Sequence, residues 1–199
     1  MSYPKFFDTI QTIQLQDPIS NILGVFPKGE YEISYLDVVK SAGHSCPTVA
    51  GAYIMTQAAL EALYAEERSV RGNLKVEFAE DIEEGVAGVI GNVVSHITGA
   101  TDKSGFKGLQ GKFARHSLMF YNADINASAR FTRIDTGKSV DVFYSHNAIP
   151  ADPNMMPLMQ KIMAGSATQE EFVMFGNLWQ ERVQNIFENL DKVVKIQNK

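Results

Sequence analysis

Cysteine is nearly absent from this sequence, since Cys46 is the single cysteine among 199 residues. One cysteine cannot form an intramolecular disulfide, so an oxidising compartment offers the chain no advantage. No segment approaches the ~20 consecutive apolar residues that a membrane-spanning helix needs. Residues 1–8 also lack the apolar region of a secretory signal. These absences predict a cytoplasmic protein without a membrane partner.

Positive charge is also scarce, because 18 Lys and Arg stand against 23 Asp and Glu and leave a net charge of −5. Proteins that bind nucleic acids need a concentrated excess of cations to displace the counterions of the phosphates. A nucleic-acid partner is therefore not expected. The 15 Gly and 7 Pro are an average share, which excludes collagen-like and low-complexity chains. The 45% hydrophobic and 21% charged residues are typical of a globular protein.

The spacing of apolar residues predicts an α+β fold built on a mixed or antiparallel sheet. A helix is expected from Pro47 to about Glu66, because Pro47 suits the first helical position and apolar residues recur at helical spacing. Its many alanines keep the helix narrow, so we expect it to lie buried against the sheet. The remaining elements are expected to be a brief strand at 31–34, a short helix at 35–40, and strands at 74–78, 86–97, 115–121, 127–134 and 139–144.

Residues 151–199 are expected to form a helical extension of a domain at residues 1–150. Residues 155–163 contain four Met and predict a Met-rich helix. Thr168 and Glu171 have the spacing of a capping box, and a long apolar and aromatic stripe follows them. Such a stripe must cover something apolar, either the sheet of this domain or a partner chain.

The sharpest chemical signal is the segment at residues 43–47, which reads Gly-His-Ser-Cys-Pro. His44 and Cys46 can point into one space, and both are good ligands for zinc or another divalent transition metal. The positive end of the following helix favours a thiolate at Cys46, which can hold a metal or attack an electrophile. Alternatively, Cys46 is a small buried hydrophobe and His44 satisfies a carbonyl group. The spacing alone leaves both interpretations open.

Three blocks of the sequence resemble the FmdE/FwdE family, whose members accompany formylmethanofuran dehydrogenase. Residues 43–47, followed by Gly51 and an Ala-rich helix, resemble its G-H-x-C-P-G segment. Residues 98–101, Thr-Gly-Ala-Thr, resemble its T-G-C-T loop. Residues 111–114, Gly-Lys-Phe-Ala, resemble the G-K-x-A block that opens its next strand. The three blocks occur in the order of the family, and the resemblance covers roughly residues 35–144.

The resemblance implies an α+β domain with a mixed sheet, a homodimer, and a pocket lined by His44 and Cys46 in which a metal can bind. The sequence departs from the family in three places. Ala100 stands where the loop has a cysteine, Thr48 stands where a glycine is usual, and no cysteine-rich zinc ribbon follows the domain. These departures favour a general redox-accessory or binding role over classical methanogenesis.

Further residues are candidates for the same site. Zinc prefers about four ligands, and His116 is the expected third ligand, with His96 as an alternative. Thr98 and Lys112 lie in two of the resembling blocks and are expected to bind a cofactor; Lys112 can position an anionic group as a point charge. His146 is expected at the solvent-exposed surface.

The sequence therefore predicts a metal-binding accessory protein, with zinc as the expected metal, or a ligand-binding protein of a redox pathway. Its expected partners are a redox enzyme or a small molecule. One alternative is an enzyme that uses Cys46 as a nucleophile and His44 as its base. Another is a protein that binds haem or a similar small cofactor against the Met-rich helix. Binding is favoured over catalysis, because no carboxylate stands out as a group that orients His44.

Overall fold

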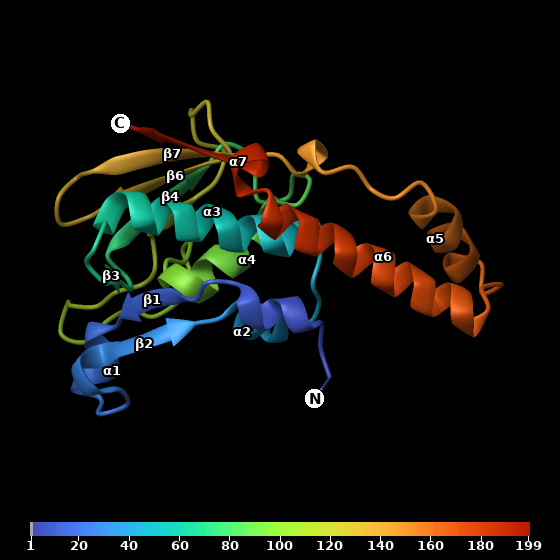
Figure 1. The fold of residues 1–199 in the computed structure, drawn as a ribbon. Coiled ribbons are helices and arrows are strands. Elements are labelled where there is room, and N and C mark those ends of the chain that lie inside the picture. Colours follow the sequence, from blue (N-terminus) through green and yellow to red (C-terminus); the bar gives the residue numbers. More distant parts are fainter. Residues whose placement is uncertain (1) are drawn as a thin grey trace.

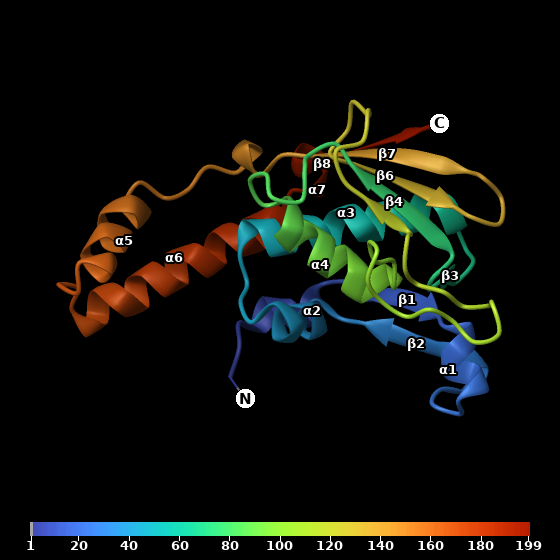
Figure 2. The same ribbon diagram turned by 180° about the vertical axis from the view of Figure 1, so that it is seen from behind.

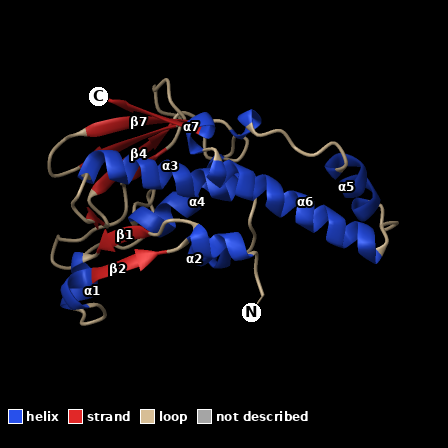
Figure 3. Cartoon of the chain, in the orientation of Figure 1, coloured by secondary structure: helices blue, strands red, loops and turns tan. Residues whose placement is uncertain are grey.

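The computed structural model describes residues 2–199, which form two sheets with helices between and beside them (Figure 1 and Figure 3). The helices are α1 (Pro18–Ile22), α2 (Tyr35–Ala42), α3 (Pro47–Tyr64), α4 (Ala87–Thr98), α5 (Met155–Met163), α6 (Gln169–Glu188) and α7 (Leu190–Val193). The strands are β1 (Ile13–Gln16), β2 (Glu30–Ile33), β3 (Ser69–Val70), β4 (Leu74–Phe78), β5 (Met119–Phe120), β6 (Ala129–Arg133), β7 (Ser139–Tyr144) and β8 (Val194–Asn198).

Both sheets are mixed. The larger sheet has the strand order β5-β4-β6-β7-β8, in which β5 runs parallel to β4 and the other neighbours are antiparallel. The smaller sheet has the order β2-β1-β3, with β1 antiparallel to β2 and parallel to β3. The predicted α+β fold with a mixed sheet is confirmed.

Helix α3 lies between the two sheets, as the views from both sides show (Figure 1 and Figure 2). Towards the smaller sheet, the Tyr53 hydroxyl lies 2.7 Å from the carbonyl oxygen of Gln11 and 3.2 Å from that of Ile33. Towards the larger sheet, Gly51 lies against the ring of Tyr144 at the end of β7. Its small residues let the helix approach both layers closely, so the predicted buried, Ala-rich helix is correct.

The strand predicted at residues 86–97 is wrong, because this segment is helix α4, which lies beside α3 (Figure 2). The abundance of Val and Ile suggested a strand. The buried residues Ala87, Gly91, Val94 and Thr98 instead follow steps of four, three and four, which is the spacing of one helix face. Packing of that face against α3 and against the residues at β5 outweighs the weak β preference of the residues. Gly99, with φ 76°, ends the helix.

The strands predicted at residues 115–121 and 127–134 are shorter than expected. Only Met119 and Phe120 form β5, and β6 is confined to residues 129–133. The chain before β5 cannot remain extended, because Ser117 has a φ of 57° and Arg115 turns inward to an ion pair with Asp17. The ion pair between Arg115 and Asp17 thus prevents residues 115–118 from forming the strand that their sequence predicts.

The C-terminal residues form α5 and α6 as predicted, and the capping box of Thr168 and Glu171 is present. Together α5 and α6 make an arm that projects from the sheets (Figure 1). The inner half of α6 packs on the core through Val183 and Ile186. The chain then returns as β8, which pairs with β7 and was not predicted from the sequence. No helix within residues 2–199 combines the length and apolar character needed to cross a membrane.

Candidate functional site

The predicted His-x-Cys motif forms the tight turn between α2 and α3. Gly43 ends α2 with a φ of 78°, and Cys46 is the N-cap residue of α3. The Cys46 sulfur accepts a hydrogen bond from the Val49 N–H at 3.4 Å, and Pro47 occupies the first turn, where no N–H is needed. Cys46 is 9% exposed. The sulfur thus caps a helix beneath the surface.

Helix α6 covers this turn from a distant part of the sequence. The carbonyl oxygen of Ser45 accepts hydrogen bonds from Trp179 Nε1 at 2.9 Å and from Gln180 Nε2 at 3.3 Å. The Ser45 hydroxyl lies 2.9 Å from the Tyr35 hydroxyl. The aromatic stripe of α6 therefore serves partly to hold the His-x-Cys turn against the domain.

His44 contacts the end of α2 through its ring nitrogen. Its ring is exposed, and its Nδ1 lies 3.1 Å from the carbonyl oxygen of Ala42. Within residues 2–199 no hydrogen bond joins His44 to Cys46. A nucleophile and its base need such contact, so this structure does not present the pair as an assembled catalytic unit.

The other predicted ligands form no metal-binding group with this turn among the described residues. The Nδ1 of His116 lies 3.0 Å from the Ser117 hydroxyl, in the irregular segment before β5. His96 is half-buried on α4; burial, together with Arg71, lowers its pKa. No group of three or more His, Cys, Asp or Glu in the described residues could hold a metal ion. Because zinc prefers about four ligands, the donors within one chain do not fit a protein-held zinc ion.

The predicted cofactor-binding residues have local partners. Thr98 is buried, and its hydroxyl donates to the Val94 carbonyl at 2.8 Å and accepts from the Ala100 N–H at 3.1 Å. It therefore completes the C-terminal turn of α4. Lys112 is exposed, and its main chain pairs with that of Leu109 in a tight turn.

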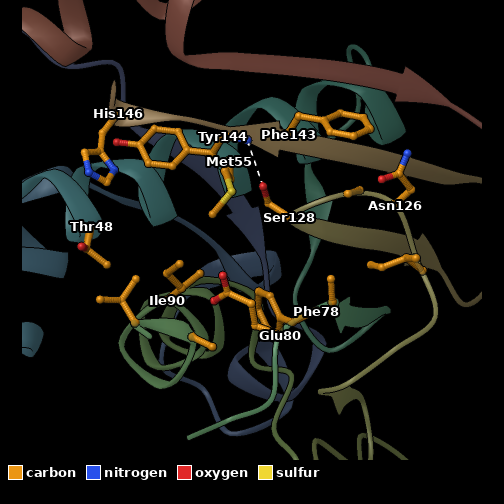
Figure 4. Close-up of a pocket in the computed structure, with 15 residues that line it drawn as sticks. Thr48, Met55, Phe78, Glu80, Ile90, Asn126, Ser128, Phe143, Tyr144 and His146 are labelled. Atoms are coloured by element: carbon orange, nitrogen blue, oxygen red, sulfur yellow. Dashed lines mark hydrogen bonds between the residues drawn. The ribbon is translucent and has the colours of Figure 1, made fainter. Parts of the chain in front are cut away.

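A cavity of about 480 Å³ opens beside the first turns of α3, and we call it the α3–β7 cavity (Figure 4). Its walls are α3, the start of α4, the residues after β4, the loop before β6 and the end of β7. The apolar and aromatic lining residues are Met55, Phe78, Ala79, Val86, Ala87, Ile90, Ile125, Ala127, Phe143 and Tyr144. The polar ones are Thr48, Glu80, Asn126, Ser128 and His146. An apolar body with a few polar groups is the usual lining of a small-molecule site.

Tyr144 joins this cavity to the His-x-Cys turn. Its hydroxyl donates to the carbonyl oxygen of Pro47 at 2.8 Å, and burial raises the pKa of the phenol. Its main-chain N–H donates to the Ser128 hydroxyl at 3.1 Å, the bond drawn in Figure 4. Burial and the nearby Arg182 lower the pKa of His146. His146 is thus half-buried at a cavity wall, which corrects the expectation of a solvated surface residue.

A second cavity of about 480 Å³ lies between α2 and α4 and is lined by both His44 and His96. Its lining includes Ser41, Asn92 and Ser95 but no Phe, Tyr or Trp among the described residues. The α3–β7 cavity has the more apolar and aromatic lining, so it is the better candidate for an organic ligand.

The chain matches a known protein-family model. Residues 42–195 match the family model FmdE, described as "Molybdenum formylmethanofuran dehydrogenase operon". The match includes the His-x-Cys turn, strands β4 to β7 and the start of β8 in the larger sheet, and the arm. A comparison with curated proteins finds no match.

Proposed function

The chain belongs to the FmdE family, and from this premise we propose that it is an accessory protein of a redox pathway that binds a small organic molecule. The α3–β7 cavity is the observation that carries this proposal. Its volume of about 480 Å³ lies within the ~300–1,000 Å³ typical of ligand sites. It also adjoins the segment at residues 43–47 through which the sequence resembles the family, because Thr48 follows this segment and the Tyr144 hydroxyl donates to the carbonyl of Pro47.

Binding fits the geometry better than Cys46 chemistry does. The Cys46 sulfur is used as a helix cap, and the His44 ring faces the main chain of Ala42. In the α3–β7 cavity, by contrast, the side chains of Glu80 and Asn126 donate to or accept from no other protein group in the described structure. They are available to a ligand.

The proposal is tested by filling the cavity. We expect at least one of three small aromatic probes (naphthylmethylamine, naphthylmethanol and naphthoate) to bind the wild-type protein. The substitution Ile90→Trp places an indole in the cavity, so every probe that binds should lose at least about tenfold in affinity. Isothermal titration calorimetry measures the affinities, and circular dichroism checks that the variant is folded.

Ile134→Trp is the matched control, because Ile134 is exposed and lies outside the cavity. This variant should bind the probes as the wild type does. Failure of all three probes to bind the wild type, or equal binding by the wild type and Ile90→Trp, contradicts the proposed function.

We also propose that the protein is a homodimer that associates through the outer half of the α5–α6 arm. Met163, Phe172 and Met174 are 74%, 57% and 48% exposed there. Apolar side chains gathered on a projecting element favour burial against another chain, and a second copy offers the same surface.

Phe172→Glu combined with Met174→Glu should therefore reduce the mass in solution from about twice 22.0 kDa to 22.0 kDa. Multi-angle light scattering gives the mass, and Lys195→Glu, on exposed β8, is the control. Truncation before Ser166 would also remove the outer part of the arm, but it would remove β8 from the larger sheet as well. The point substitutions leave β8 in place. A monomeric wild type, or a dimer that survives both substitutions, contradicts the proposal.

A further inference from the structure

The α3–β7 cavity carries charge of one sign. Of the described residues that line it, Glu80 alone has a formal charge at neutral pH. His146 lies on the opposite wall in Figure 4, where burial and Arg182 disfavour its charged form and lower its pKa. Neither Lys nor Arg belongs to the lining. An anionic ligand would therefore face a carboxylate and no cation among the lining residues.

The Glu80 carboxylate is directed into the cavity, between Ile90 and Phe78 (Figure 4). Its main chain is fixed, because the Asn122 N–H donates to the Glu80 carbonyl at 2.9 Å. None of the ion pairs in residues 2–199 uses its side chain. Glu80 is itself exposed, so its carboxylate stands at the open side of the cavity with no cation of the described residues paired to it.

Three aromatic side chains, those of Phe78, Phe143 and Tyr144, line the same cavity as this charge. Phe78 is 2% exposed and stacks on Tyr121, with ring centroids 5.1 Å apart, so its position is fixed. Phe143 and Tyr144 line the wall on the β7 side. The faces of such rings attract cations, and the attraction strengthens where water is excluded. A carboxylate beside aromatic rings is a suitable environment for an ammonium group on an apolar body.

We infer that the α3–β7 cavity binds an organic cation, namely a protonated amine on a flat apolar or aromatic body, with the Glu80 carboxylate as its counter-ion. This inference rests on the proposed function and specifies its ligand class. Arg182 lies on the His146 side, where its Nε donates to the Ile149 carbonyl at 3.2 Å. Repulsion from Arg182 and attraction to Glu80 together orient the amine towards the Glu80 wall.

The same three naphthyl probes test the ligand class, since they share one ring and differ in charge. The wild type should bind naphthylmethylamine at least about tenfold more tightly than naphthylmethanol, and naphthoate most weakly. Glu80→Gln keeps the shape of the side chain but removes its charge, so the amine and the alcohol should then bind almost equally. Glu83→Gln is the control, because Glu83 is an exposed acid of the same turn that does not line the cavity. It should retain the preference for the amine.

The outcomes separate this inference from the proposed function. If the wild type binds the alcohol as tightly as the amine, and Ile90→Trp abolishes both, the cavity is a ligand site but the inferred ligand class is wrong. If Glu80→Gln prefers naphthylmethylamine over naphthylmethanol as strongly as the wild type does, Glu80 is not the counter-ion of the amine. If no probe binds the wild type, both the inference and the proposed function are overturned.

Discussion

Replacement of Asp17 by Asn is expected to lower the free energy of unfolding by about 3–5 kcal/mol. The Asp17 carboxylate is 5% exposed and accepts hydrogen bonds from Arg115 Nη2 at 2.7 Å and Arg71 Nη1 at 3.4 Å. Arg115 is itself 7% exposed, and its Nη1 is buried without a hydrogen-bond partner in the described structure. Loss of the carboxylate charge therefore leaves a buried guanidinium with no anion to compensate it.

Two further variants control this measurement, which is made by urea-induced unfolding. Glu30→Gln breaks a pair with Arg68 that is 3.8 Å long and exposed on both sides, so the change should stay below about 1 kcal/mol. The double substitution Asp17→Asn and Arg115→Met should lower the free energy of unfolding less than Asp17→Asn alone does. In the double variant no unpaired charge is buried at residue 115. A loss below about 1 kcal/mol in Asp17→Asn contradicts the importance of this ion pair.

The same ion pair explains one limit of prediction from the sequence. It joins residues that are 98 positions apart, and nothing in the local pattern of residues 115–121 indicates that Arg115 turns inward. The segment therefore resembles a strand, although only β5 forms. The segment of α4 shows a related limit, since its Val and Ile are typical of strands while its burial follows a helical face.

Elements with strong local signals are predicted well. Pro47 and the small residues of α3 define a buried helix, and Thr168 with Glu171 marks the start of α6. These signals lie within a few residues of the helix that they specify, so the helix can be predicted without knowledge of its tertiary contacts. Strand β8 has no such signal and forms because β7 offers it an edge.

The candidate site is predicted only in part, for the same reason. The His44–Cys46 turn is local and can be recognised, whereas the α3–β7 cavity is assembled from several distant segments. The sequence does not show that Glu80 and His146 lie on opposite walls of one cavity, because the segments that carry them are far apart in the chain. Aromatic residues at the ends of two strands, Phe78 and Tyr144, are the available signal.

Substitution of Gly51 by Ala is expected to destabilise the protein by about 1–3 kcal/mol, although Ala is the better helix former. A Cβ atom at residue 51 would lie 2.2 Å from Cε1 of the Tyr144 ring. The ring cannot withdraw freely, because its hydroxyl is bonded to Pro47 and its main chain belongs to β7. Displacement of Tyr144 also changes the wall of the α3–β7 cavity, so binding of the naphthyl probes should weaken at least about tenfold.

Gly176→Ala is a control that should change the stability in the opposite direction to Gly51→Ala. Gly176 lies in the interior of α6, and a Cβ atom there would meet nothing within 4 Å. This substitution should stabilise the protein by about 0.5–1 kcal/mol through helix propensity alone. In a Tyr144→Ala background the ring is gone, and Gly51→Ala should then resemble Gly176→Ala. Urea-induced unfolding of the four proteins gives the coupling energy between residues 51 and 144. If Gly51→Ala stabilises the otherwise wild-type chain, α3 does not pack against β7 through Tyr144 as closely as these distances require.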